Sequence, residues 1–136
     1  MSYKLIGSLC VCVFLLASCA SPYQKARPFS GGTGYLEKHV TPILLRVEFR
    51  ANAATTTEDA QNKALFRCAQ IALENKKSYF FLFPTLNAVA SKDAGSTPQV
   101  GRMDYYWVQA IAYIVLLDEK KEGALDAREI LKISEI

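Results

Sequence analysis

The sequence contains the segment Ile43-Leu44-Leu45-Arg46-Val47-Glu48-Phe49-Arg50, in which apolar and charged side chains alternate from Leu45 onward. One face carries Leu45, Val47 and Phe49, and the other carries Arg46, Glu48 and Arg50. Such period-two alternation indicates an antiparallel strand with one face on a core and one face in water. We expect residues 35–40 to be extended as well, and Thr41-Pro42 to form the turn of a hairpin.

A long helix is expected after this hairpin. The residues Thr55-Thr56-Thr57-Glu58 match a capping box, in which a threonine oxygen accepts an amide hydrogen of the first turn and the glutamate accepts one in return. The helix can continue to about Lys77, where Lys76 and Lys77 would complement the negative end of its dipole. Its apolar face is Ala60, Ala64, Cys68, Ile71 and Ala72. The small side chains on this face predict close packing on a sheet.

Two further apolar runs predict strands. Residues 79–83 are aromatic apart from one leucine and are followed by Pro84, which suits a short buried strand. Residues 105–117 predict one long strand, and they are fewer than the roughly 20 residues that a membrane-spanning helix needs. Aromatic side chains in these runs could form a binding platform, but core packing is the default for aromatic residues in strands. They are Tyr79, Phe80, Phe81, Phe83, Tyr105, Tyr106 and Trp107.

The connection from Pro84 to Met103 contains glycine, proline and several small polar residues, so we expect it to be irregular. Long irregular connections are usually either functional or disordered, and both alternatives stay open. Asp126 and Glu129 predict the cap of a short C-terminal helix. The predicted class is therefore α+β, with two layers: an antiparallel or mixed sheet of about four strands, one long helix packed on it, and a short C-terminal helix.

The N-terminus predicts export and processing. Lys4 precedes an apolar stretch that is shorter than a membrane span and ends in small residues, as in a signal peptide. The stretch ends in Leu16-Ala17-Ser18-Cys19, which resembles the lipobox of bacterial lipoproteins. The resemblance implies cleavage before Cys19 and attachment of acyl chains to Cys19. A cleaved but unlipidated secreted protein is the alternative, because residues 18–20 also suit an ordinary signal cleavage site.

We therefore divide the chain into a lipoprotein signal peptide (1–18), a lipidated cysteine with a flexible tether (19–34) and one α+β domain (35–136). Residues 20–34 carry two prolines and three glycines, which favours a tether that cannot order itself. Among the four cysteines only Cys68 would remain as a free thiol, so an intramolecular disulfide framework is excluded. We expect Cys68 to fill core space, the alternative being an intermolecular disulfide.

Four short motifs follow one another along the chain. They are residues 49–52, 55–60, 64–69 and 125–130, which read FRAN, TTTEDA, ALFRCA and LDAREI. Behind a lipobox and a glycine-rich stretch, they resemble a family of small proteobacterial lipoproteins named after Caulobacter members. The chain departs from that pattern at Ala51 and Ala53, where the family has glycine, and at Cys68, where it has alanine. The resemblance implies an envelope lipoprotein of Gram-negative bacteria and carries no catalytic residue.

The resemblance singles out five polar residues: Arg50, Asn52, Arg67, Asp126 and Arg128. Of these, Arg50, Asn52, Arg67 and Arg128 are our candidate contacts with a ligand or partner. Caps, turns and surface ion pairs explain such residues without function. If they cluster, their arginines could bind an anionic ligand, because a guanidinium matches carboxylates and phosphates. His39 is the only histidine, and a surface position at the end of the hairpin explains it without a catalytic role.

The function expected from the sequence is that of a membrane-anchored lipoprotein with a structural or interaction role in the cell envelope. The membrane partner would be reached through acyl chains on Cys19, and an envelope protein or the cell wall would contact a sheet face or residues 84–103. Ala20, which follows the predicted anchor, favours the outer membrane with the domain facing the periplasm. The alternative is a periplasmic module that binds a small ligand. We expect no enzyme, no metal, no cofactor and, with a net charge of only +3, no nucleic-acid partner.

Overall fold

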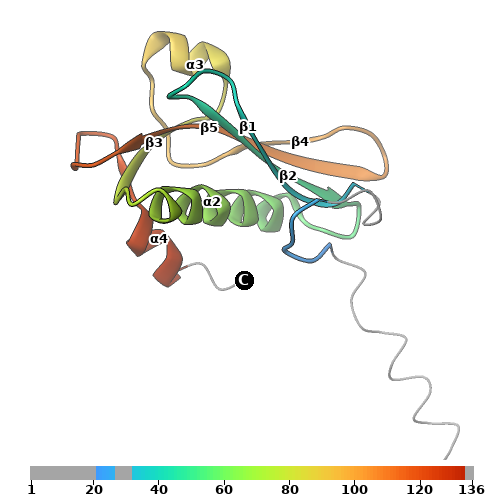
Figure 1. Ribbon diagram of the computed structural model, residues 1–136. Coiled ribbons are helices and arrows are strands. Elements are labelled where there is room, and N and C mark those ends of the chain that lie inside the picture. The colour runs from blue at the N-terminus through green and yellow to red at the C-terminus, as the bar shows by residue number, and fades with distance from the viewer. Residues whose placement is uncertain (1–20, 27–31, 134–136) are drawn as a thin grey trace, which may run out of the picture.

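The computed structural model describes residues 21–26 and 32–133 (Figure 1). The predicted signal peptide and Cys19 lie outside the described residues. The elements follow one another as β1 (Gly34–His39), β2 (Leu45–Asn52), α2 (Thr57–Glu74), β3 (Tyr79–Phe83), α3 (Leu86–Ser91), β4 (Gln99–Arg102), β5 (Trp107–Leu117), β6 (Leu125–Asp126) and α4 (Ala127–Ile133).

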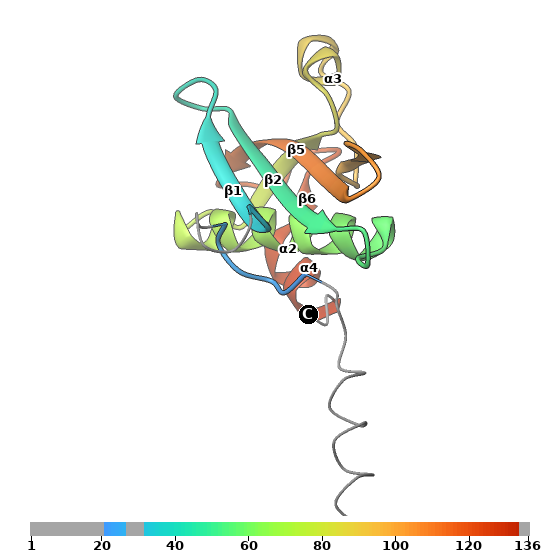
Figure 2. The ribbon, with the colours of Figure 1, turned by 90° about the vertical axis from the view of Figure 1, so that its right-hand side faces the viewer.

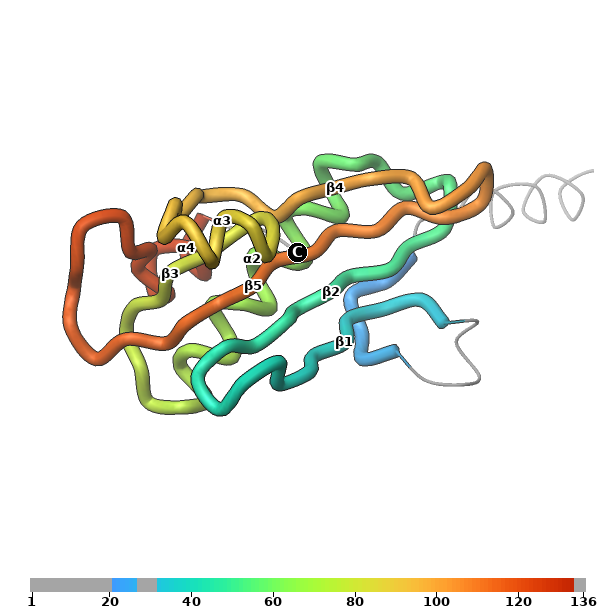
Figure 3. The backbone as a smooth tube through the Cα atoms, turned by 90° about the horizontal axis from the view of Figure 1, so that it is seen from above, coloured from blue at the N-terminus to red at the C-terminus, as the bar shows by residue number. Residues whose placement is uncertain are grey.

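The described strands form one antiparallel sheet in the order β1-β2-β5-β3-β6. Figure 3 shows β1, β2 and β5 side by side. The central strand is β5, and β2 pairs with it from Leu45 opposite Ile114 to Asn52 opposite Trp107. The other edge of β5 is shared, because β4 and β3 pair with successive parts of it. The α+β class and the antiparallel sheet are thus confirmed, while the described sheet has six strands instead of about four.

Helix α2 lies across one face of the sheet, as predicted (Figure 1). Its N-cap is Thr56, whose hydroxyl accepts from the amide of Asp59 at 3.1 Å, so the cap is one residue later than the motif suggested. The predicted end at Lys77 was wrong, because the helix ends at Glu74. Lys76 has a left-handed backbone with φ of 57°, and Lys77 forms an ion pair with Asp118 instead of ending the helix.

Small side chains let α2 approach the sheet closely. Ala60, Ala64, Cys68 and Ala72 have no exposed surface, and they face a sheet whose central strand contributes the buried Ala110 and Ala112. Larger buried side chains lie beside them: Val47, Phe49, Phe80, Leu82, Val108 and Ile114. Helix α4 packs on α2 and adds Ala127 and Ile130 to the core.

The predicted irregular connection contains regular structure. Thr85 caps α3, a third helix that was not predicted from the sequence. Helix α3 lies on the face of the sheet opposite α2 (Figure 2). Residues Gln99–Arg102 form β4 and close a hairpin with β5. The predicted start of the long strand at Tyr105 was also wrong, because Tyr105 and Tyr106 lie in the hairpin turn and β5 begins at Trp107.

Part of the predicted tether belongs to the domain. Within residues 19–34, Ser21 is only 2% exposed, and Lys25 forms a parallel bridge with Tyr35 at the outer edge of β1. The amide of Ala26 donates to the carbonyl of Tyr35, and the amide of Tyr35 donates to the carbonyl of Gln24. The domain therefore starts well before the predicted boundary at residue 35.

The close contact between α2 and the sheet predicts that Ala64→Leu destabilises the protein. The added atoms would collide with a fully buried surface, and overpacking of this kind costs about 1–3 kcal/mol. Asn62→Leu introduces the same side chain on the exposed side of α2 and serves as the control. Urea unfolding measures both. Equal stability of the two variants would show that α2 does not pack closely at Ala64.

Candidate functional site

Ser21 is held at the end of the sheet by three hydrogen bonds. Its amide donates to Oγ1 of Thr55 at 2.9 Å, and its hydroxyl oxygen accepts from the amide of Asn52 at 2.8 Å. Its carbonyl accepts from Nζ of Lys63 at 2.9 Å. We call these four residues, Ser21, Asn52, Thr55 and Lys63, the Ser21 clamp. The clamp joins the N-terminal segment to the end of β2 and the first turns of α2.

Lys63 is the unusual member of the clamp, because lysine is seldom buried without a partner. Its side chain is 11% exposed, and its ammonium group donates both to Ser21 and to the carboxylate of Asp59 at 2.8 Å. It also lies 5.6 Å from the ring centre of Phe49, which adds an attraction between the cation and the ring. The partners of Lys63 therefore compensate for the loss of water around its charge.

Tyr23 extends this attachment along the flank of the domain. Its ring lies 5.2 Å from the ring centres of Tyr35 and Phe66, and 6.5 Å from that of Phe49. Its hydroxyl donates to Oε1 of Gln70. Burial raises the pKa of the Tyr23 hydroxyl although the charge of Arg67 opposes the shift, so the hydroxyl stays protonated and available as a donor.

Gly34 makes this attachment sterically possible. Its φ is +117°, a conformation that side chains other than glycine rarely adopt. A Cβ atom at this position would lie 2.2 Å from the carbonyl oxygen of Gln24 and 2.8 Å from the amide nitrogen of Ala26. Glycine at this position therefore lets the N-terminal segment lie directly against β1.

A second polar cluster lies on the face of the sheet opposite α2. Glu48 is only 1% exposed, which corrects the expectation that this face of β2 is fully solvated. Its carboxylate accepts hydrogen bonds from Arg46, Arg50 and Gln109, and the two arginine side chains are 30% and 40% exposed. The arginines lie at positions that flank Glu48 on the same strand face and cover it.

The surroundings of Glu48 keep it ionised. Burial alone would raise the pKa of this carboxyl, but hydrogen bonds from Arg50 and Gln109 and the charge of Arg46 outweigh it and hold the pKa below its usual value. The cluster therefore contains one anion and two cations. Its net charge is positive, and parts of Arg46 and Arg50 are exposed to solvent.

The structure separates the two arginines that were candidates for one pocket. Arg50 is on the sheet face opposite α2, whereas Arg67 lies between α2 and β1. The guanidinium of Arg67 donates to the carboxylates of Glu37 and Glu74 and lies 4.6 Å from the ring centre of Tyr35. Burial alone would lower the pKa of Arg67, but hydrogen bonds to Glu74 and Glu37 outweigh it and raise the pKa. Arg50 lines one surface hollow with Met103 and Trp107 and another with Arg46 and Glu48, and Arg67 lines neither of the two.

The other candidates have structural surroundings. Asn52 belongs to the Ser21 clamp, and its side-chain oxygen accepts from the amide of Ala54 in the turn before α2. Arg128 is exposed in the first turn of α4, far along the chain from the clamp. His39 is exposed at the end of β1. Cys68 is fully buried, as expected for core filling, and burial raises the pKa of its thiol.

Sequence reasoning missed Ser21, Tyr23, Lys63 and the burial of Glu48. The position of Lys63 offered a signal, because it directly precedes Ala64 and lies three residues after Ala60, beside the apolar face of the helix. Among residues 21–26 and 32–133, no group of three or more acidic, histidine or cysteine side chains could hold a metal ion. No helix in the same ranges is long and apolar enough to cross a bilayer.

Comparisons with known proteins found no matching family model, no matching curated protein and no matching solved structure.

The steric fit at Gly34 predicts that Gly34→Ala releases the N-terminal segment from β1. The new methyl group would overlap the backbone of Gln24, so the segment must move and its hydrogen bonds with Tyr35 must break. Limited proteolysis should then cleave within residues 21–26 faster than in the wild type. Gly101→Ala is the matched control, because a Cβ atom there has no neighbour within 4 Å. Equal cleavage of both variants would contradict the fit.

The Glu48 cluster predicts a loss of stability in acid. A carboxyl whose pKa is lowered by folding stabilises the folded state above its unfolded pKa of about 4.3, and this contribution is lost as the pH falls through the folded pKa. Glu48→Gln should cost about 2 kcal/mol at neutral pH, because it leaves two arginines without their anion. It should also flatten the dependence of unfolding free energy on pH in acid.

The control for this variant is Glu129→Gln, which removes the carboxylate from an exposed ion pair with Lys132. Such surface pairs contribute little, so its stability and its pH dependence should match those of the wild type. Urea unfolding between neutral and acidic pH measures both variants. If Glu48→Gln retained the full acid dependence of the wild type, Glu48 would not be responsible for it.

Proposed function

We propose that this protein is a membrane-anchored bacterial lipoprotein with a structural or interaction role in the cell envelope. The observation that supports the proposal best is the position of Ser21, which is buried and clamped two residues after the predicted lipidation site. Cleavage before Cys19 would retain every residue of the described domain. The predicted processing site and the start of the domain are therefore compatible.

The anchor in this proposal is short. Two extended residues span at most about 7 Å, so the Cα atom of Cys19 cannot lie farther than this from that of Ser21. Acyl chains on Cys19 would thus hold the domain directly at the bilayer instead of at the end of a long tether. Resistance to dissociation comes from the chains, at about 0.8 kcal/mol per buried methylene.

We also propose that the domain acts by contact and not by catalysis. Most charged groups in the described polar clusters have partners within the chain. Arg67 donates to Glu37 and Glu74, and Lys63 donates to Asp59 and Ser21. The exposed parts of Arg46 and Arg50 are suited to an acidic group of an envelope protein or of the cell wall. Helix α3 borders this surface and carries Leu86, which is 52% exposed.

The proposed location is the periplasmic side of the outer membrane. It rests on Ala20 after the predicted anchor and on the resemblance to small envelope lipoproteins of Gram-negative bacteria.

The alternative function, a module that binds a small ligand, would need convergent polar groups in a hollow. Arg50 and Arg67 lie on different faces of the sheet, so these two arginines do not converge on one ligand.

The anchor is tested by expressing the full chain in a Gram-negative host. We expect the wild type to gain the mass of its acyl chains, to begin at Cys19 and to sediment with membranes. Cys19→Ala should lose both the added mass and the membrane association, because no other residue would accept the lipid. Intact mass spectrometry and membrane fractionation measure these properties.

The matched control is Cys68→Ala, which removes the other cysteine expected in the processed chain and leaves the predicted lipidation site unchanged. This variant should keep the added mass and the membrane association. A soluble wild-type protein without added mass would contradict the proposed function.

A further inference from the structure

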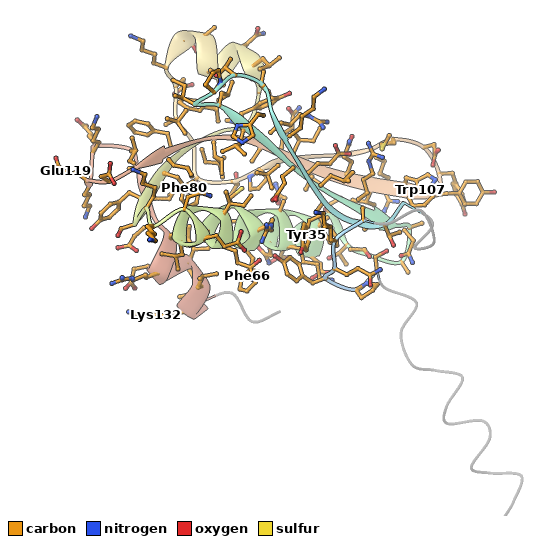
Figure 4. All side chains as sticks on the ribbon, in the orientation of Figure 1. Tyr35, Phe66, Phe80, Trp107, Glu119 and Lys132 are labelled. Carbon is orange, nitrogen blue, oxygen red and sulfur yellow. The ribbon has the colours of Figure 1, made fainter. Side chains whose placement is uncertain are left out.

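The turn between β4 and β5 exposes three large apolar side chains in a short stretch. Met103 is 56% exposed, Tyr105 83% and Tyr106 68%. Single exposed apolar residues are ordinary, but these three lie within four positions of one turn, directly before Trp107, which Figure 4 labels at one end of the sheet. We call Met103, Tyr105 and Tyr106 the hairpin tip.

The hairpin tip has a defined conformation. The amide of Met103 donates to the carbonyl of Trp107 at 3.0 Å, which closes the turn. The amide of Tyr106 donates to the carboxylate of Asp104 at 2.7 Å, and the rings of Tyr105 and Tyr106 lie edge to face with centres 5.3 Å apart. The turn therefore presents its two aromatic rings in contact with each other at the surface.

The hairpin tip and the Ser21 clamp lie at the same end of the sheet. Ser21 accepts from the amide of Asn52, Asn52 is the direct partner of Trp107 across β2 and β5, and Trp107 bonds to Met103. Figures 1 and 3 both show the β4–β5 turn at the end of the molecule to which residues 21–26 are attached. An anchor on Cys19 would therefore hold this end next to its membrane.

We propose that the hairpin tip inserts into the interface of the bilayer that holds the acyl chains of Cys19. This inference rests on the proposed function. Tyrosine and tryptophan favour the interface of a bilayer, where the ring contacts apolar chains and the polar group stays in water. Arg102, exposed beside the tip, can reach phosphate headgroups. The domain would then have a fixed orientation, with the opposite end of the sheet directed away from the bilayer.

The opposite end provides an internal control. The turn between β1 and β2 carries Ile43, which is 71% exposed and thus as accessible as the hairpin tip. It precedes the start of β2, whereas the clamp is at the end of β2, and eight strand residues span about 25 Å. An exposed apolar residue there should remain outside the bilayer.

Tryptophan fluorescence in vesicles of phosphatidylethanolamine and phosphatidylglycerol with brominated acyl chains tests the proposal. Trp107 is the only tryptophan, so the Trp107→Phe variant has no tryptophan fluorescence of its own. In the lipidated full chain with this change, we compare Tyr105→Trp with Ile43→Trp. Brominated chains should quench the first at least about twice as strongly as the second, because only the first would be in the interface.

A second variant keeps Trp107 as the probe. Tyr105→Ser combined with Tyr106→Ser should reduce the quenching of Trp107 to about half, while the acyl chains keep the protein on the vesicles. Unchanged quenching of Trp107, or equal quenching of the tryptophans placed at positions 105 and 43, would overturn the inserted tip and leave the proposed function intact. Absence of lipid on Cys19 would overturn both proposals, and intact mass of the same samples identifies that case.

Discussion

Helix α2 packs closely on the central strand β5, and the other core contacts are arranged around this packing. Alanines and Cys68 on α2 share buried clusters with Ala110 and Ala112 on β5, so small side chains on both elements let the helix lie near the sheet. Bulky side chains must then fill the flanks. On the β1 side the flank is closed by Phe49, Tyr35 and Phe66 together with Tyr23 from the N-terminal segment. The segment next to the predicted anchor is thus part of the packing.

This dependence connects the fold to the proposed function. Tyr23 and the Ser21 clamp attach the chain to one particular end of the sheet, and that end also bears the exposed aromatic turn. A lipoprotein whose domain began after a long flexible tether would have no preferred orientation. With Ser21 fixed, the anchor and the hairpin tip would act at the same surface, and the Glu48 cluster would remain available to a partner.

Local patterns predicted the parts of the fold that depend on local interactions. The hairpin around Thr41-Pro42, the cap near Thr56 and the aromatic strand at residues 79–83 follow from alternation, capping chemistry and β propensity. The missed parts depend on distant partners. The strand from Gln99 to Arg102 has little apolar character and exists because β5 offers an unpaired edge. The order of residues 21–26 depends on Lys63 and Thr55, more than 30 positions away, and the burial of Glu48 depends on Gln109.

Residues 21–26 are packed as part of the domain and would fix the end of the sheet at which a lipid anchor on Cys19 emerges. Solution NMR of the processed chain can observe this packing. We expect cross-peaks between the ring of Tyr23 and the rings of Phe49 and Phe66, and backbone relaxation in residues 21–26 equal to that of the strands. Coil-like relaxation in this segment, with no contact between Tyr23 and those rings, would show that residues 21–26 are not packed on the domain.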